Sequence, residues 1–334
     1  MLGASRVHQA LLRRAPSFLR QSMAWYPATT RVTNPHFERR HWMPFSSVQP
    51  RDPATKVVVT VPPAPVRVPE QTQPVPVDTN LHLSPLDAVR YNTSYAAYRT
   101  DRPAPVIFMS GVLGGCFLGF AGMLMTLVAG GSPMLAAANP GLWQLAYGAV
   151  FPIGLSMIIL TGADLFTGNT MTSSLMVLGH GERGLRRNLS ELGRLWGVSI
   201  AGNFVGGLLL ATAATATVVA TGPYAAFAAG LAVKKCSLGF GVALTKGILA
   251  NWMVNVGIFM ASTSRTTIGK MAACWGPIML FVALGLEHSI ANMFLIPFGM
   301  LCGADVSVSA YLLDNLVPVV MGNACLLYTS DAAD

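Results

Sequence analysis

The amino-acid sequence predicts an all-α membrane protein whose six spans form an inverted repeat of three and three. Hydrophobic residues make up 52% of the 334 residues and charged residues only 11%, against about a quarter in soluble domains. The charges are also segregated, and four long stretches carry at most one charged residue each: 106–178, 195–233, 236–264 and 271–304. A helix needs about 20 apolar residues to cross the hydrocarbon core, so these stretches predict several membrane-spanning helices.

Two segments in opposite halves of the chain have matching patterns. Residues 162–169 read GADLFTGN and residues 285–292 read GLEHSIAN. Each places a carboxylate, Asp164 or Glu287, five residues before an asparagine, Asn169 or Asn292. Polar groups at bilayer depth are costly and usually mark a pathway. Glycine-interrupted apolar segments at matching places in two halves are typical of a transporter's central site.

The N-terminal part is expected to precede the membrane domain. Residues 1–50 contain seven arginines and one acidic residue, a composition typical of an organelle transit peptide, mitochondrial or plastid. A disordered basic tail is the alternative interpretation. Residues 51–82 are rich in proline, which predicts an extended linker. Residues 83–104 predict an amphipathic helix that begins after Ser84, because serine followed by proline is a helix-start signal.

Six spans are predicted within a membrane domain at 105–328, followed by an atypical tail at 329–334. They lie near 105–130, 142–178, 193–220, 238–262 and 271–301, and the sixth begins near 315. The second and fifth are too long for one straight helix, so we expect breaks at 163–168 and 287–292, with freed backbone amides facing the pore. Three spans per half put the two halves in opposite orientations. The last apolar stretch, 316–328, is too short to span and predicts a truncated sixth helix.

Loop charges predict the topology. Arginines and lysines before the first span and in the second-to-third and fourth-to-fifth loops indicate that the N-terminus shares a side with these loops. Lys234 and Lys235 lie on the opposite side, in the third-to-fourth loop, where we expect them to attract anions. The net charge of +8 is concentrated in the N-terminal arm and loops, so it does not indicate nucleic acid. The scattered cysteines predict no metal or cofactor site.

At these residues the chain resembles the formate/nitrite transporter family. The motifs are residues 162–169, 246–254 and 287–297, and the resemblance covers about residues 83–323. It implies a homopentamer with an aquaporin-like fold and one anion pathway per protomer. It also implies two hydrophobic constrictions, at Leu155, Leu165 and Phe166 and at Phe151, Phe281 and Val254. The transport or proton-relay residues that it implies are His288, Thr167, Asn251 and Asn323, and it identifies Lys235 as a vestibule lysine.

The chemistry of the central residues supports two roles. His288 is expected to manage protons, because histidine titrates near pH ~6.5 and a neutral acid avoids the desolvation cost of an anion. Asp164 and Glu287, with Asn169 and Asn292, are expected to be structural, the carboxylates accepting hydrogen bonds from backbone groups freed at the breaks. Leu165 and Phe166 are expected to face the pathway.

Three functions were compared. The leading hypothesis is transport of a small monovalent anion such as formate or nitrite across the lipid bilayer, by proton symport or passive flow. A membrane-embedded enzyme or cofactor protein is the second, but His288 is the only histidine after His180, which excludes di-histidine ligation in the core. A neutral-solute channel is the third, and its paired Asn-Pro-Ala motifs are absent. We therefore expect no catalytic residues and no cofactor.

Overall fold

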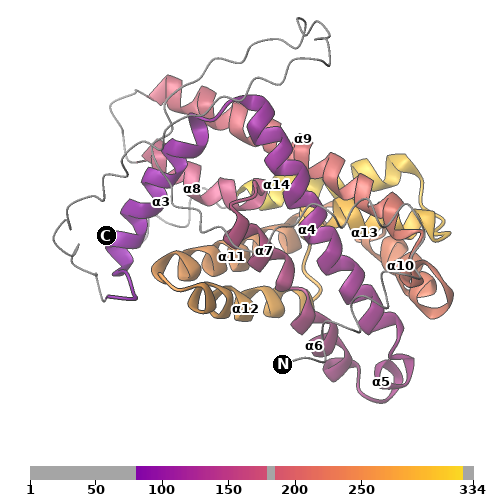
Figure 1. The fold of residues 1–334 in the computed structure, drawn as a ribbon. Helices are drawn as coiled ribbons and strands as arrows, with labels where there is room; N and C mark the ends of the chain where they lie inside the picture. The colour runs from indigo at the N-terminus through magenta and orange to yellow at the C-terminus, as the bar shows by residue number, and fades with distance from the viewer. Residues whose placement is uncertain (1–79, 179–184, 326–334) are drawn as a thin grey trace, which may run out of the picture. The chain divides into compact units, whose positions relative to one another are not determined.

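The computed structural model describes residues 80–178 and 185–325 (Figure 1). The regular elements in these ranges are helices, and the one exception is an isolated β-bridge between His82 and Ser264. The predicted transit peptide, nearly all of the linker and the predicted tail lie outside the described residues.

The helix predicted after Ser84 is α3 (Pro85–Thr100). The Ser84 side chain accepts a hydrogen bond from the Asp87 backbone N–H at 3.2 Å, and Pro85 occupies the first turn. The Ser84 hydroxyl also donates to the Asp87 carboxylate, and this bond, with Arg90 nearby, lowers the pKa of Asp87. Just before α3, the Leu83 N–H donates to Thr263 O at 2.7 Å, which attaches the start of the helix to the second half of the chain.

The helices of the membrane domain follow in two series. The first comprises α4 (Ala104–Gly130), α5 (Pro133–Ala138), α6 (Pro140–Val150), α7 (Ile153–Thr161), α8 (Phe166–Leu178) and α9 (Leu185–Ala214). The second comprises the 3₁₀ turn η1 (Val218–Ala220), α10 (Gly222–Cys236), α11 (Phe240–Thr263), α12 (Thr267–Ala283), α13 (Ser289–Leu301), the π-helical η2 (Ala310–Leu316) and α14 (Val317–Ala324). Figure 1 shows α11 and α12 side by side, and α8, α14 and α13 in the interior.

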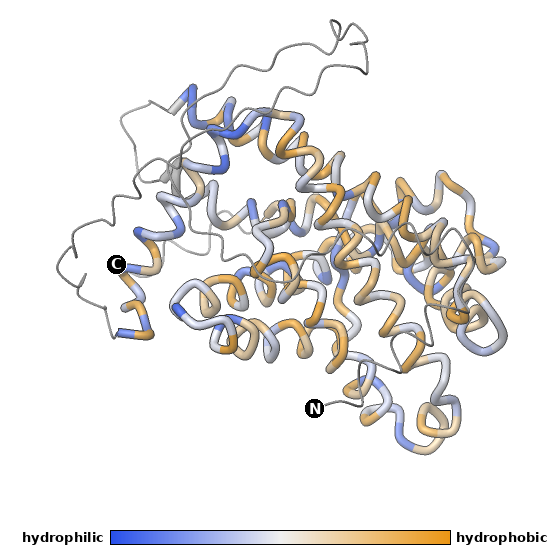
Figure 2. Tube along the Cα trace, in the orientation of Figure 1, coloured by the Kyte–Doolittle hydropathy of each residue, from blue (hydrophilic) through white to orange (hydrophobic). Residues whose placement is uncertain are grey.

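Four described helical segments are long and apolar enough to cross a membrane: 104–130, 140–161, 186–214 and 240–263. The fifth predicted span consists of two shorter apolar helices, α12 and α13. Figure 2 shows how hydropathy is distributed over these helices. Hydrophilic residues are concentrated on α3 and the beginning of α9, and hydrophobic residues lie along the central helices.

Both interruptions lie earlier in the chain than predicted. The first non-helical stretch covers 162–165 rather than 163–168, and the second covers 284–288 rather than 287–292. Each begins at or near a glycine with positive φ, Gly162 at 73° and Gly285 at 64°. Each ends early because a side chain caps the next helix: Asn203 Oδ1 accepts from the Phe166 N–H, and His288 Nδ1 accepts from the Ala291 N–H.

Glycines allow pairs of helices to approach backbone to backbone. A Cβ added at Gly206 of α9 would lie 2.0 Å from Val112 O of α4. The second half has the same arrangement, where a Cβ at Gly322 of α14 would lie 2.4 Å from Leu244 O of α11. Close helix contacts through small residues are the usual packing mode in membranes, where no hydrophobic force drives helices together.

Candidate functional site

Two cavities approach each other at the first interrupted helix. Tyr147 and Phe151 line a cavity of about 290 Å³ that we call cavity 2. Leu155 and Ile158, farther along the same helical segment, line a cavity of about 100 Å³ that we call cavity 1. Phe151 lies in the turn between α6 and α7, and Leu155 follows four residues later in α7, so the two cavities lie against neighbouring parts of the chain. We call the apolar residues that line the cavities here, Phe151 and Phe281 on the side of cavity 2 and Leu155 and Leu165 on the side of cavity 1, the apolar layer.

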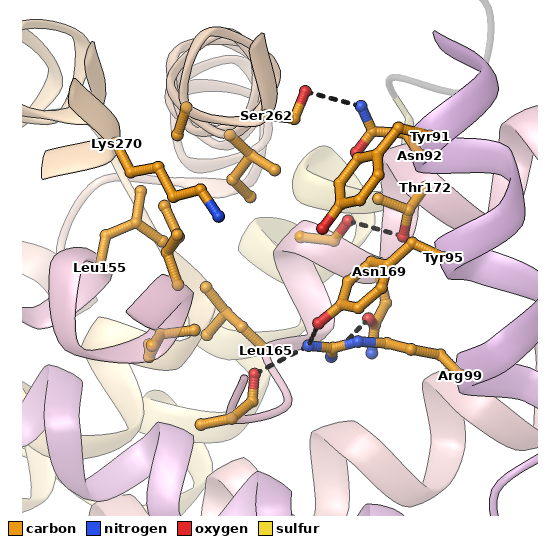
Figure 3. Close-up of a pocket in the computed structure, with 16 residues that line it drawn as sticks. Tyr91, Asn92, Tyr95, Arg99, Leu155, Leu165, Asn169, Thr172, Ser262 and Lys270 are labelled. Carbon is orange, nitrogen blue, oxygen red and sulfur yellow. Dashed lines mark hydrogen bonds between the residues drawn. The ribbon is translucent and has the colours of Figure 1, made fainter. Parts of the chain in front are cut away.

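Most polar side chains of cavity 1 lie on one side and most apolar side chains on the other, with Lys270 extending from the side of Leu155 (Figure 3). The apolar wall comes mainly from α7, the segment at Ala163–Leu165 and α11, with Leu155, Ile158, Ile159, Ala163, Leu165, Ile258 and Ala261. The polar side chains come from α3, α8, α11 and α12, and are Tyr91, Asn92, Tyr95, Arg99, Asn169, Thr172, Ser262 and Lys270. None of the described residues that line this cavity is acidic.

Cavity 2 contains the predicted lysines and the predicted central histidine. Lys234, Lys235 and His288 all line it, with the rings of Phe151 and Phe281. Lys234 and Lys235 belong to the last turn of α10, not to a loop as predicted, because the helix continues to Cys236. Phe281 stacks against His288 with ring centroids 5.8 Å apart, and meets Phe151 edge-on at 6.1 Å.

His288 joins the two interrupted helices. Its Nε2 lies 3.0 Å from Thr167 Oγ1 of α8, and its Nδ1 accepts the Ala291 N–H of α13 at 3.1 Å. A neutral histidine has one donor and one acceptor nitrogen. Because Nδ1 is the acceptor here, the proton of the neutral ring is on Nε2, which donates to Thr167. Charging the ring requires a second proton on Nδ1, and this proton displaces the hydrogen bond that caps α13.

Asp164 lies in the first interruption and is fully buried. It accepts hydrogen bonds from Arg99 Nη1 at 2.5 Å and Arg102 Nη1 at 2.7 Å. The Asn169 amide donates to the same carboxylate at 3.2 Å. We predicted backbone donors for this carboxylate, but its donors are these side chains, because two arginines on α3 and the turn that follows it reach the break. A buried carboxylate requires such partners to remain charged.

Glu287 repeats this arrangement in the second interruption. It accepts from Lys235 Nζ at 2.9 Å, Asn292 Nδ2 at 2.7 Å and Asn315 Nδ2 at 3.1 Å. Its partners are again side chains rather than the predicted backbone groups. Lys235 is therefore ion-paired and buried, while Lys234 is exposed.

Two further asparagines hold the interruptions in matching ways. Asn203 accepts from the Phe166 N–H at 2.9 Å and donates to Asp164 O and Gly111 O. Asn323 accepts from the Ser289 N–H at 2.8 Å and donates to Glu287 O and Gly247 O. Three of the amides at the breaks, those of Phe166, Ser289 and Asp164, are thus bound by protein acceptors rather than facing the pore, the last of them by Ser110.

The remaining predicted residues are buried between helices. Asn251 donates to Thr170 Oγ1 at 2.9 Å and also to Asn323 O. Phe166 and Val254 are buried but line neither cavity. The Phe166 ring meets Trp196 of α9 edge-on at 5.7 Å, because α8 begins at this residue and directs it toward α9. Among the described residues, no group of three or more His, Cys, Asp or Glu side chains is placed to hold a metal.

Comparison with known proteins identifies the family. A family model described as formate/nitrite transporter matches residues 87–325. The chain belongs to the formate/nitrite transporter family. The chain is 34% identical over 257 residues to a probable formate transporter of Methanothermobacter thermautotrophicus. The match covers 72% of this chain and 91% of that protein. The chain is also 32% identical over 266 residues to the formate channel FocA of Haemophilus influenzae, covering 73% and 90%.

Solved structures have the same fold. A structure titled pentameric formate channel with formate bound matches this formate/nitrite transporter family member with a TM-score of 0.58 and 25% identity, covering 66% of this chain and 91% of that one. An FNT family ion channel matches with a TM-score of 0.62. The predicted family and the all-α membrane fold are confirmed.

Sequence reasoning missed four residues that hold the site. Arg99 and Arg102 were used only to predict the topology, although a buried Asp164 requires a positively charged partner. Asn315 gave no signal of its own. Asn203 follows Gly202 as Asn323 follows Gly322, and this match is the sequence signal that could have identified Asn203, although only Asn323 belongs to the predicted site.

Proposed function

We propose that this protein transports small monovalent anions, formate, nitrite or a similar monocarboxylate, along a pathway that joins the two cavities. The observation that carries the proposal is His288, bonded to Thr167 between the two interrupted helices at the wall of cavity 2. Membership of a transporter family supports the same conclusion. We infer that the protein is a transporter and not an enzyme.

The apolar layer between the cavities favours a neutral form of the substrate. Leu155 and Leu165 lie on its cavity 1 side, and Phe151 and Phe281 on its cavity 2 side. Moving an unpaired carboxylate into such surroundings costs many kcal/mol, whereas its protonated acid pays only the smaller cost of a polar group. A proton gained before the layer and released after it lowers the barrier to transfer.

His288 and Thr167 supply the polar groups at this point. In the neutral state, Nε2–H donates to Thr167, which leaves the threonine hydroxyl proton available to an arriving anion. An anion beside Thr167 favours the imidazolium, whose proton can pass to the carboxylate and leave a neutral acid. Passing the Nε2 proton to the carboxylate leaves the ring protonated on Nδ1 alone, so the ring regains the form that caps α13 only after it gives up the Nδ1 proton and takes a proton back on Nε2. Charging the ring breaks the bond between Nδ1 and the Ala291 N–H, so proton uptake is coupled to the start of this helix.

Uptake of labelled formate and nitrite into proteoliposomes, with and without a pH gradient, tests the proposal. Wild-type uptake is expected to increase when the outside is acidic. His288→Asn keeps a side-chain acceptor for the α13 amides but does not titrate. The variant is expected to fold and to lose most of the pH dependence. Transport of neither anion by wild-type protein would contradict the proposed function, and an unchanged pH profile in the variant would contradict the role of His288.

We also propose a homopentamer in an organelle inner membrane, mitochondrial or plastid. The pentameric formate channel supports the assembly, and the seven arginines and single acidic residue of residues 1–50 support the targeting. Residues 1–50 fused to a fluorescent protein are expected to direct it to one of these organelles. A fusion that stays in the cytosol would contradict the targeting.

A further inference from the structure

We propose that cavity 1 is a binding antechamber for a small monocarboxylate, in which Lys270 provides an unpaired charge and the half-buried Tyr95 and the buried Arg99 provide hydrogen-bond donors. The inference rests on the proposed function and adds to it a binding site on the α3 side of the apolar layer. None of these three residues was predicted as a site residue.

Lys270 is the free positive charge of this cavity. It is in the first turn of α12, and Figure 3 shows its side chain extended toward the wall formed by Tyr91 and Tyr95. Its ammonium group pairs with no carboxylate in residues 80–178 or 185–325. Arg99, by contrast, is paired with Asp164, whose single negative charge it shares with Arg102, so this cluster keeps a net positive charge beside the cavity. An anion in the cavity would therefore be attracted by this cluster and would find in Lys270 a cation with no carboxylate partner among the described residues.

Tyr95 and Arg99 each leave a hydrogen directed to no acceptor in the described protein. Arg99 Nη2 donates to the Tyr95 hydroxyl at 2.6 Å, so this oxygen acts as an acceptor. Its own O–H makes no hydrogen bond to a described residue. Arg99 is only 6% exposed, and its Nε is buried without a partner among the described residues. A buried donor without an acceptor, such as Arg99 Nε, is destabilising, and an anion in the cavity would supply the acceptor.

The shape of the cavity defines the ligand class. The carboxylate would lie between the Lys270 ammonium group and the side chains of Tyr95 and Arg99, and the carbon substituent would contact apolar lining residues such as Leu155 and Ile258. A volume of about 100 Å³ limits the ligand to a few heavy atoms. An acid with one or two apolar carbons uses both walls, whereas an inorganic oxyanion uses only the polar one.

The entrance to cavity 1 is also mainly positively charged. Tyr91, Ser262 and Lys270 also line an open surface pocket, together with Arg90, Arg265 and Asp87. Lys270 therefore stands where the surface pocket meets the antechamber. Anions from the α3 side would reach Lys270 before the apolar layer.

Transport kinetics in right-side-out and inside-out membrane vesicles test the antechamber. Lys270→Gln is expected to raise the half-saturating formate concentration about tenfold when formate is offered from the α3 side, the loss expected for one charged hydrogen bond. It should leave the value from the other side unchanged. Lys270→Arg should restore most of the affinity, and Tyr95→Phe should cause a smaller loss on the same side. Arg90→Gln is the matched control, since it removes one positive charge from the surface pocket but does not line cavity 1.

Unchanged half-saturation in Lys270→Gln, or an equal loss in Arg90→Gln, would overturn the antechamber while leaving the proposed function intact. Saturation-transfer NMR with propionate and purified protein decides the site even if vesicles transport nothing. Transfer to the propionate methyl group that is lost in Lys270→Gln and kept in Arg90→Gln supports it. Equal transfer in both variants, or none with wild type, overturns it.

Discussion

Lys234 and Lys235 are neighbours in the sequence but have different surroundings. The sequence predicted one role for both, anion attraction at a loop. In the structure Lys235 is buried against Glu287, while the neighbouring Lys234 is exposed on the wall of cavity 2. Sequence alone could not separate them, because the difference depends on a carboxylate 52 positions away.

Removing the charge of Lys235 tests this difference. Lys235→Gln leaves Glu287 buried without its cation, and breaking such a pair typically costs about 3–5 kcal/mol. The variant is expected to show a clearly lower unfolding temperature in detergent, and the double variant with Glu287→Gln to recover part of it. Lys234→Gln should keep wild-type stability and lose uptake mainly at low ionic strength, where salt does not screen attraction. Equal stability of the two single variants would contradict the assignment.

Helix interruptions were partly predictable. Gly162 and Gly285 and the polar residues after them indicated where regular helix could not continue. The end of each interruption was predicted too late, because it depends on a capping side chain. Asn203 comes from α9 and acts on α8, and no local pattern in residues 162–169 records that contact. The matching Gly-Asn pairs that contain Asn203 and Asn323 can be read from the sequence. The backbone carbonyls to which these two side chains donate cannot.

The contact between α4 and α9 depends on glycine at Gly206. Gly206→Ala places a methyl group against the backbone oxygen of Val112, so the helices must separate. Overpacking of this kind typically costs about 1–3 kcal/mol. We expect a lower yield of folded protein and a lower unfolding temperature. Gly193→Ala on the same helix is the matched control, since a Cβ there meets nothing within 4 Å. An equal loss in both variants would mean that helix flexibility, not close approach, requires glycine.

At the scale of the whole molecule, composition and charge segregation were sufficient for the fold class. The family and the membrane fold followed from long uncharged stretches and three motifs. The two cavities could not be predicted from the sequence, because each is lined by side chains from several helices that are distant in sequence. Cavity 1 combines α3, α7, α8, α11 and α12, and sequence spacing contains no information on that combination. The opposite orientation of the two halves stays a prediction.

The proposed assembly predicts a defined mass. Five copies of the 35.3 kDa chain give about 177 kDa for a closed ring of identical subunits. Native mass spectrometry after detergent removal should find this mass. If the N-terminal segment is cleaved, the expected mass is five times that of the shortened subunit. A monomer or dimer over the whole range of mild detergents would contradict the pentamer.

The two asparagine contacts also have a consequence for biogenesis. The first interruption is held by Asn203, which is synthesised only 37 residues after the Phe166 amide that it caps. The second is held by Asn323, 34 residues after Ser289 and near the end of the described chain. The first half can complete its hydrogen bonds while the ribosome is still adding α11, whereas the second half must wait for α14. A translocon releasing helices in order would therefore hold α12 and α13 with an open joint until α14 has emerged.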